Sequence, residues 1–398
     1  MNINKAFKFR IYPNNTQKQF LAQSFGCARF VYNRFLRQRI DYYAETGKGL
    51  TYPDNANALT QLKKLPEFEW LNDINSQSLQ QALRNLDVAY HNFFNKKAKF
   101  PNFKKKSNKQ SFSVPQNFSI HDNELDIPKC KGIKIKLHRD IEGTIKSITI
   151  SKTPSGKYFA SVLCELDIPE PIYSGNEIGI DYGVKAFITT SDGNIIESPK
   201  FLRKSELKLK QLSRSFSKKQ PNAKNRYKAQ KLLARQHDKV SNQRQDFLNK
   251  LSKRLVCDNQ AIYIESLAIR NMIQNHCLAK SISDSGWNTF VNMLKYKGVW
   301  YGCRIIEIDR WFPSSKRCHV CGYIKDNLTL SDRYWLCPEC NTIHDRDVNA
   351  AINILTFGRA GIARTTVLET ENVCGEGSPS VSLSSPSLKQ EASAFMRG

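Results

Sequence analysis

The chain has 398 residues, 40% of them hydrophobic, and a formal net charge of +25. This size allows two or three folded domains, while the lack of any run of 18 apolar residues excludes a transmembrane helix. The N-terminal residues have no apolar signal-peptide core, so we expect a cytoplasmic protein. The large positive charge predicts a polyanionic partner, with nucleic acid favoured over a membrane surface.

The first 110 residues predict one strand followed by helices. Residues 1–12 alternate apolar and basic side chains, which is typical of a strand. A helical pattern begins at Asn15, and a second one begins near Ser76 or Ser78. The second pattern ends in KFPNFKKK, a basic and aromatic segment suited to phosphate contacts through Lys104, Lys105 and Lys106.

The middle of the chain changes first to strands and then to basic helices. Residues 111–170 contain short alternating segments separated by turns, and they predict an antiparallel sheet or small barrel to which the first strand can add. Residues 176–196 predict two or three strands. Residues 201–256 predict a long helical pair with 17 Lys or Arg and three acids, a net charge of +14. More than half of the excess charge is therefore clustered, which supports binding to a polyanion.

The last third predicts a short buried strand at residues 261–266, a helix from Gly286 to Tyr301 and another strand at residues 304–308. The segment after about Gly358 is rich in Ser and Gly and has no apolar periodicity. We expect this tail to be disordered.

Two cysteine pairs predict a zinc ribbon. Cys318-x2-Cys321 and Cys337-x2-Cys340 are separated by 15 residues, a spacing that suits four thiolates around one structural ion. Four thiolates complete the coordination, so His319 and His344 are expected to be polar loop residues. The other cysteines are expected to be buried as small apolar side chains, and they are Cys27, Cys130, Cys164, Cys257, Cys277, Cys303 and Cys374.

Three acids are candidates for a second metal centre. Asp181 and Glu265 each follow alternating isoleucines on a predicted strand. Taken alone, Asp181 is better explained as a strand-end residue and Glu265 could be one too, but the same pattern on two buried strands favours a functional role for both. Asp345 and Asp347 both precede a helix, and we assign Asp345 as its N-cap and Asp347 as the functional acid. Three carboxylates from two strands and a helix can hold two Mg²⁺ or Mn²⁺ ions about 4 Å apart for phosphodiester hydrolysis.

Several motifs resemble one family. GIDYGVKAF, IYIESLAIRNM, FPSSKRCHVCG and CPECNTIHDRDVNAAINI are similar to the RuvC-type nuclease and zinc-ribbon region of the TnpB (OrfB) proteins of bacterial transposons. KAFKFRIYPN, GCARFVYNRFL and KFPNFKKK are similar to the N-terminal region of that family, so the resemblance covers about residues 1–356. The resemblance implies an RNA-guided endodeoxyribonuclease related to type V CRISPR effectors, which hydrolyses DNA with two metal ions. It also implies that Asp181, Glu265 and Asp347 are the three acids of the catalytic triad.

The resemblance also implies the architecture, which combines α/β, all-β and helical parts. The nuclease domain is expected to have an RNase H-like (RuvC) fold with an inserted zinc ribbon. The N-terminal part is expected to be a β-barrel (wedge-like) domain with an inserted helical recognition domain. The expected boundaries are 1–12 and 111–172 for the β-barrel domain, 13–110 for the helical domain, 173–311 and 345–358 for the nuclease domain, 312–344 for the ribbon and 359–398 for the tail.

The partners implied by the resemblance are a guide RNA from the transposon transcript and a target DNA that carries a short flanking motif. One copy of the protein per RNA is expected, in the cytoplasm of a bacterial or archaeal host. Tyr52, Ser76 and Gln80 are candidates for reading the flanking motif, and an ordinary polar surface role is as well supported for each. Phe100 and Phe103 are expected to pack in a core rather than stack on bases.

Two other functions remain open. A guided DNA-binding repressor would lack cleavage, but it would be expected to have lost triad acids, and all three are present. A guide-free RuvC-like nuclease or transposition accessory protein would leave the large basic N-terminal half without a role.

Overall fold

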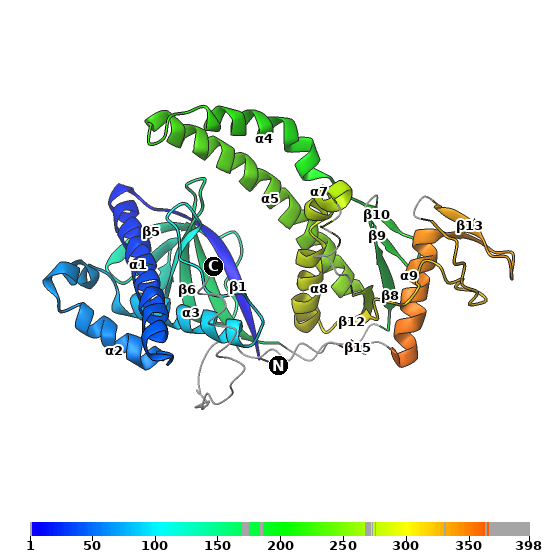
Figure 1. Ribbon diagram of the computed structural model, residues 1–398, viewed down its shortest axis with the longest axis horizontal. Coiled ribbons are helices and arrows are strands. Elements are labelled where there is room, and N and C mark those ends of the chain that lie inside the picture. Colours follow the sequence, from blue (N-terminus) through cyan, green and yellow to red (C-terminus); the bar gives the residue numbers. More distant parts are fainter. Residues whose placement is uncertain are drawn as a thin grey trace.

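The computed structural model describes residues 2–168, 175–183, 186–266, 272, 274, 276–329, 332–362 and 364–365. These residues form two lobes, each built on a β-sheet, and a long helical hairpin connects the lobes (Figure 1). No described helix has both the length and the apolar character needed to cross a membrane.

The N-terminal lobe contains a seven-stranded sheet in the order β2-β6-β7-β1-β5-β4-β3. Every neighbouring pair is antiparallel, and β1 lies between β7 and β5, which confirms the predicted addition of the first strand. The strands are β1 (Asn2–Tyr12), β2 (Gln110–Val114), β3 (Ser119–His121), β4 (Glu124–Ile127), β5 (Cys130–Lys136), β6 (Thr144–Lys152) and β7 (Tyr158–Asp167).

A closed barrel is not formed by the described strands. The edge strands β2 and β3 do not pair with each other, so the predicted antiparallel sheet is confirmed, whereas its closure into the predicted β-barrel is not seen among the described strands. The strands at one end of the sheet are short, since β3 has three residues and β4 has four, against 11 in β1, and in the described part of the chain β3 pairs with β4 alone.

Helices pack on this sheet to form one continuous core. Leu21, Phe25 and Phe35 of α1 are in the same buried cluster as Phe7 and Phe9 of β1. The predicted helices from Asn15 and Ser76 are confirmed, whereas the short second helix was missed. The helices are α1 (Asn15–Thr46), α2 (Tyr52–Leu62), the 3₁₀ helix η1 (Pro66–Asp73) and α3 (Ser76–Phe94).

The C-terminal lobe contains a six-stranded sheet in the order β10-β9-β8-β11-β12-β15. Its centre is parallel, because β11 pairs in parallel with both β8 and β12, and the remaining strands are antiparallel to their neighbours. The strands are β8 (Glu177–Tyr182), β9 (Ala186–Thr190), β10 (Ile195–Glu197), β11 (Ala261–Glu265), β12 (Arg304–Ile308) and β15 (Arg364–Thr365).

Helices cover both faces of this second sheet. Leu248 of α5, Phe290 of α8 and Ile282 of α7 share a core with Ile180 and Ile264, whereas Ile354 of α9 lies in a separate cluster on the opposite face. The hairpin of β13 and β14 lies between β12 and α9 in the chain and projects from the end of the lobe (Figure 1). These elements are α4 (Phe201–Ser217), α5 (Lys224–Asp258), α7 (His276–Ser285), α8 (Trp287–Tyr301), β13 (Tyr334–Leu336), β14 (Ile343–Asp345) and α9 (Arg346–Phe357).

The folded part of the chain extends beyond residue 358, where the disordered tail was predicted to begin. After α9 the chain forms a short turn of π-helix, η2 (Gly358–Ile362), and then β15, which pairs antiparallel with β12. Arg359 also forms an ion pair with Glu177 of β8, with 2.6 Å between Nε and Oε2. The predicted boundary at 358 is therefore wrong, because the sheet continues to Thr365. The rest of the predicted disordered tail lies outside the described residues.

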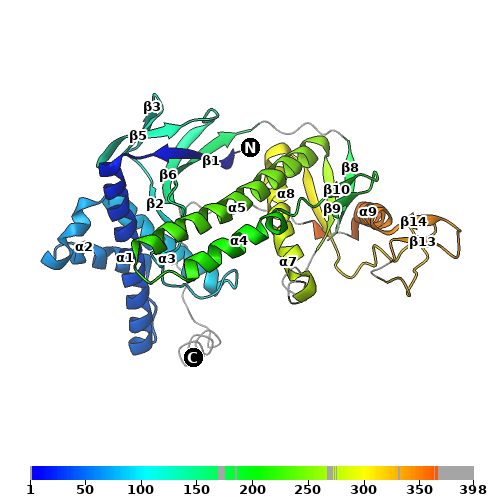
Figure 2. The same cartoon turned by 90° about the horizontal axis from the view of Figure 1, so that it is seen from above.

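The basic hairpin of α4 and α5 spans the two lobes (Figure 2). Asp238 of α5 accepts a hydrogen bond from the Ser155 hydroxyl in the turn between β6 and β7. Val299 and Trp300 at the end of α8 pack against the N-terminal core. Both α5 and the end of α8 therefore contact the N-terminal lobe.

Gly179 lets α9 lie directly on β8. A Cβ atom at this position would overlap the carbonyl oxygen of Ala351 and lie 2.8 Å from the backbone nitrogen of Leu355. Both obstacles belong to the helix backbone, so they cannot move aside without moving α9.

We predict that Gly179→Ala lowers the free energy of unfolding by about 3 kcal/mol, because the new methyl group forces α9 away from the sheet. Gly26→Ala is the matched control, since a Cβ atom there meets nothing within 4 Å inside α1, and it should change stability by about 1 kcal/mol or less. Chemical denaturation of both variants measures the difference. Equal stability of the two variants would contradict the close contact.

Candidate functional site

Asp181 and Glu265 lie at matching positions on neighbouring strands. In the parallel pair of β8 and β11, Ile180 is opposite Ile264, and each acid follows its isoleucine directly. Both isoleucines belong to the core on the α5 and α8 face. Because side chains alternate along a strand, both carboxylates point to the opposite face, which α9 covers.

Asp347 is brought to the same place by α9. Ala351 lies over Gly179, and Arg359 pairs with Glu177, so the helix runs antiparallel to β8. Asp347 precedes Ala351 by four residues, about 6 Å along a helix, and Asp181 follows Gly179 by two residues, about 7 Å along a strand. The two spacings match, so the start of α9 lies beside the end of β8.

The electrostatics agree with this convergence. Burial raises the pKa of Asp181 well above its ordinary value, and the negative charges of Glu265 and Asp347 raise it further, while Arg346 opposes the shift. Burial also raises the pKa of Glu265, and a hydrogen bond from the Ser314 hydroxyl partly counters this. Asp181 therefore senses both of the other acids, and a bound cation would relieve the repulsion between them.

Asp345 caps α9, as predicted. Its Oδ1 atom accepts hydrogen bonds from the backbone nitrogens of Asp347 at 2.9 Å and Val348 at 3.2 Å. The capping role is therefore filled, and the Asp347 carboxylate is available for another function.

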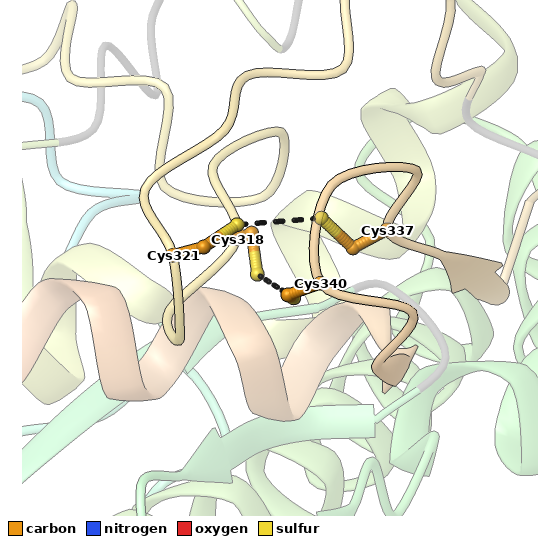
Figure 3. A group of neighbouring side chains, drawn as sticks. All are labelled: Cys318, Cys321, Cys337 and Cys340. Carbon is orange, nitrogen blue, oxygen red and sulfur yellow. Dashed lines mark hydrogen bonds between the residues drawn. The ribbon is translucent and has the colours of Figure 1, made fainter.

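The four predicted cysteines form one cluster, with sulfur atoms all within 4.8 Å of one another (Figure 3). Cys318 and Cys340 are 3.6 Å apart and Cys321 and Cys337 are 3.5 Å apart, measured between sulfurs. A tetrahedral ion with zinc–sulfur bonds of about 2.3 Å requires sulfurs about 3.8 Å apart. The donor set and its spacing therefore fit zinc.

This cluster differs from the group of acids. In the described part of the chain, the four cysteines are the one group of three or more potential ligands compact enough to surround a single ion. The three acids are not gathered so tightly. A spread set of carboxylates is what two neighbouring ions need, because each ion then takes only some of the ligands.

The prediction of polar loop residues is confirmed for His319, which is exposed in a turn, and wrong for His344, which lies in β14 and is buried. His344 is 2% exposed, and its Nε2 atom lies 3.1 Å from the Cys318 sulfur. Its ring also packs against Trp335, with 4.6 Å between centroids. His319 is hydrogen-bonded through Nδ1 to the side-chain oxygen of Asn349 at 3.0 Å. The buried His344 imidazole fills space in a ribbon that is too small to form a purely apolar core.

Two buried asparagines connect the cysteine cluster to α9, and the sequence analysis missed this role. Asn349 and Asn353 are one turn apart on the same face of the helix, each at most 3% exposed. Asn353 donates to the Ser314 carbonyl at 2.8 Å, and Asn349 donates to the Arg317 carbonyl at 2.8 Å. The signal was present in NAAIN, where two amides at helical spacing interrupt an otherwise apolar face. Ser314, which contacts Glu265, was missed as well.

Of the three residues predicted to contact the motif that flanks the target, Ser76 and Gln80 lie together. Ser76 and Gln80 line one groove of about 830 Å³ beside Lys63, and the Ser76 hydroxyl accepts a hydrogen bond from the Lys63 ammonium group at 2.8 Å. Tyr52 is not among the residues that line this groove. Its hydroxyl instead accepts a hydrogen bond from Arg84 Nε at 3.4 Å.

The three lysines of the KKK segment differ in their surroundings. The Lys104 ammonium group lies 3.9 Å from the centre of the Tyr32 ring, and burial lowers its pKa. The backbone nitrogen of Lys104 also donates to the Asn33 side chain at 2.8 Å. Lys105 and Lys106 are exposed; the Gln110 side chain donates to both of their carbonyl oxygens, and the Asn108 backbone nitrogen also donates to that of Lys105. The latter two are thus better placed for a phosphate.

The predictions for other apolar residues are confirmed in part. Phe100 packs against the N-terminal core, but Phe103 is 41% exposed and lies under Arg37, so its predicted burial is wrong. Cys257 is also exposed. The side chains of Cys277 and Cys374 lie outside the described residues. The cysteines found buried as predicted are Cys27, Cys130, Cys164 and Cys303.

The basic hairpin is largely unneutralised. Of the 17 Lys and Arg in residues 201–256, only Lys210, Arg244 and Lys250 form an ion pair with another described residue. The remaining charges lie on α4 and α5, whose residues are mostly exposed, and on the turn between these helices. The predicted clustering of positive charge is therefore present on the surface that spans the lobes.

Three family models match consecutive parts of the chain. The OrfB_IS605 model, described as "Probable transposase", matches residues 161–276, and the Cas12f1-like TNB domain model matches residues 287–354. The HTH_OrfB_IS605 model, described as a helix-turn-helix domain, matches residues 1–48. In this chain that range contains β1 and α1 rather than two helices.

Relatives are similar over nearly the whole chain. A Streptomyces pristinaespiralis protein named "Putative RNA-guided DNA endonuclease" is 39% identical, covering 94% of this chain and 92% of the relative. "Putative RNA-guided DNA endonuclease InsQ" of Escherichia coli is 31% identical, with 90% and 93% covered. The solved cryo-EM structure of a Cas12f1–sgRNA–target DNA complex has a chain with a similar fold, at a TM-score of 0.51 and 15% identity, covering 89% of this chain and 98% of that chain.

We predict that Asp181→Asn stabilises the protein at about pH 7 when no Mg²⁺ or Mn²⁺ is added. The folded-state pKa of Asp181 is raised, so its charged form costs free energy at neutral pH. The cost disappears below about pH 4, where the carboxyl is protonated in both folded and unfolded states. The gain in Tm should therefore shrink as the pH falls.

Added Mg²⁺ should raise the Tm of the wild type more than that of Asp181→Asn, because the variant has lost a ligand. Asp192→Asn, an exposed acid in the turn between β9 and β10, is the matched control and should show neither effect. A lower Tm for Asp181→Asn than for the wild type at neutral pH without Mg²⁺ would contradict the assigned repulsion.

We predict that Cys318→Ser loses bound zinc and reduces the Tm, because the ribbon has too few other contacts to hold its shape. Elemental analysis of the purified protein should find about one zinc per wild-type chain and almost none in the variant. Cys257→Ser, which changes an exposed cysteine outside the cluster, should keep its zinc. Zinc retained at the wild-type level in Cys318→Ser would rule out the four-thiolate site.

Proposed function

The chain belongs to the TnpB (OrfB) family, and we propose that it is an RNA-guided, divalent-metal-dependent DNA endonuclease of a transposable element. The observation that carries the proposal is the convergence of Asp181 and Glu265, at matching ends of parallel strands, with Asp347 at the start of α9. The order of the sheet, with β9 and β10 on one side of β8 and with β11 and β12 on the other, is compatible with the proposed RNase H-like (RuvC) nuclease domain.

The proposed reaction is hydrolysis of a DNA phosphodiester. Asp181, Glu265 and Asp347 would hold two Mg²⁺ or Mn²⁺ ions, which supply an activated water and stabilise the leaving oxygen. The Ser314 hydroxyl fixes one oxygen of Glu265 and so orients its carboxylate. The backbone contact at Gly179 fixes the distance between the two strands and α9, and hence the position of Asp347 relative to Asp181.

The proposed zinc ribbon has a structural role. Its first knuckle follows the segment that Asn349 and Asn353 bind, and its second knuckle leads through β14 into the cap of α9. Zinc held by Cys318, Cys321, Cys337 and Cys340 would therefore stabilise both chain segments that position Ser314 and Asp347. The zinc would take no part in the chemical step, because four thiolates leave it no open coordination site.

The nucleic-acid contacts follow from charge. The unneutralised cations of α4 and α5 would bind the phosphates of a guide RNA paired with target DNA, and Lys105 and Lys106 would add to them. The groove beside Ser76 and Gln80 would contact the motif next to the target, with Tyr52 on the adjoining helix. We further propose one protein per guide RNA, and the domain boundaries given above with the nuclease domain extended to Thr365.

The proposal predicts that Asp181→Ala or Glu265→Ala reduces Mg²⁺-dependent cleavage by at least about 100-fold, since each removes a metal ligand. Binding of guide RNA and target DNA should remain nearly intact, because the cations that contact phosphate are unchanged. Asp192→Ala is the control and should cleave at the wild-type rate. Retained cleavage in either triad variant would overturn the two-metal assignment.

The cleavage assay requires the guide RNA. Its sequence can be obtained by sequencing the RNA that co-purifies with the protein. A discrete RNA species is expected, and a plasmid library with a matching target and randomised flanks would then reveal the cleaved sequences. Absence of a discrete RNA would favour a guide-free nuclease. Target binding without cleavage by the wild-type complex would favour a guided repressor.

A further inference from the structure

Trp311 is the most exposed large apolar side chain in the described part of the chain, at 85%. It lies in the segment that joins β12 to the cysteine cluster. Single exposed apolar residues are common on protein surfaces, so exposure alone assigns no function. The position of this residue carries the argument.

The segment around Trp311 folds against Glu265. Glu265 is opposite Ile308 in the parallel pair of β11 and β12, and Trp311 follows three residues later. Arg310 Nε donates a hydrogen bond to the carbonyl of Ser266, the residue after Glu265, at 3.2 Å. On the other side of Trp311, the Ser314 hydroxyl binds Glu265 itself. The backbone that carries Trp311 is therefore held beside the candidate catalytic centre.

The exposed position is fixed by contacts on both sides. The Trp311 backbone nitrogen donates to Asp309 Oδ1 at 2.7 Å, which closes a tight turn. The ring of the next residue, Phe312, stacks on Phe357 of α9, with 3.9 Å between ring centres. With its neighbours anchored in this way, the indole projects into solvent, as its exposed fraction of 85% shows.

Arg310, the residue before Trp311, adds a positive charge to this exposed segment. Arg310 is exposed and forms no ion pair with any residue in the described ranges. An exposed aromatic ring whose neighbour in the chain is an arginine without an ion pair to any described residue suits single-stranded nucleic acid, in which a base stacks on the ring and a phosphate meets the cation. Bases in a paired duplex are already stacked on each other and would not use the ring.

We propose that Trp311 positions the DNA strand that enters the catalytic centre, by stacking on one unpaired base near the scissile phosphate, and that Arg310 contacts an adjacent phosphate. This inference rests on the proposed nuclease function. Stacking is tolerant of base identity, so the contact would hold any target strand in register without adding sequence specificity.

The test compares Trp311→Leu with Trp311→Phe in the purified protein–RNA complex. The target is a synthetic duplex that matches the co-purified RNA and carries 2-aminopurine near the cut site. We expect Trp311→Leu to slow single-turnover cleavage about 5- to 100-fold, whereas Trp311→Phe should stay within about threefold of the wild type. The fluorescence change of 2-aminopurine on loading should be lost only in Trp311→Leu.

Binding of the target should change less than about twofold in both variants, because guide pairing dominates it, and zinc content and Tm should be unchanged. Tyr301→Leu, which removes an exposed aromatic ring at the end of α8, is the control and should cleave normally. Equal cleavage by Trp311→Leu and the wild type would overturn this inference alone. A wild-type complex that binds but does not cleave would overturn the proposed function and the inference together.

Discussion

The backbone contact between α9 and β8 at Gly179 is the constraint on which the candidate site depends. It brings α9 against β8, the first strand of the second sheet, which lies more than 160 residues earlier in the chain. The acids are spread across this contact, two on strands and one on the helix. Packing energy from the apolar face of α9 thus opposes the repulsion among three carboxylates, which would otherwise separate the helix from the sheet.

The cysteine cluster also holds the two segments that lead into and out of the ribbon against α9. The two asparagines of α9 bind the segment before the first knuckle, and Asp345 at the end of the second knuckle caps the helix. This arrangement explains why CPEC is followed so closely by two aspartates. Asp345, at the end of the ribbon, caps the helix, and Asp347 supplies one carboxylate of the candidate site. The ribbon and the acids are separate in chemistry, but they share the same helix end.

Much of this arrangement could be predicted from the sequence because it depends on local patterns. Alternation located the strands that carry Asp181 and Glu265, and cysteine spacing located the ribbon. The open edge of the first sheet, the buried His344 and the exposed Phe103 could not be predicted, because each depends on which distant segments supply neighbours. Asn349 and Asn353 were overlooked since a buried amide looks like a surface residue until its carbonyl partners are known.

The short strand β15 has a consequence for handling the protein. The outer edge of β12 would otherwise present unpaired backbone groups, and such edges invite strand addition from another chain. Two residues of β15 occupy that edge, and the ion pair of Arg359 with Glu177 holds the preceding turn to the sheet. A shortened version that stops at the end of α9 would uncover the edge and favour aggregation, so expression of the folded part requires the chain through at least Thr365.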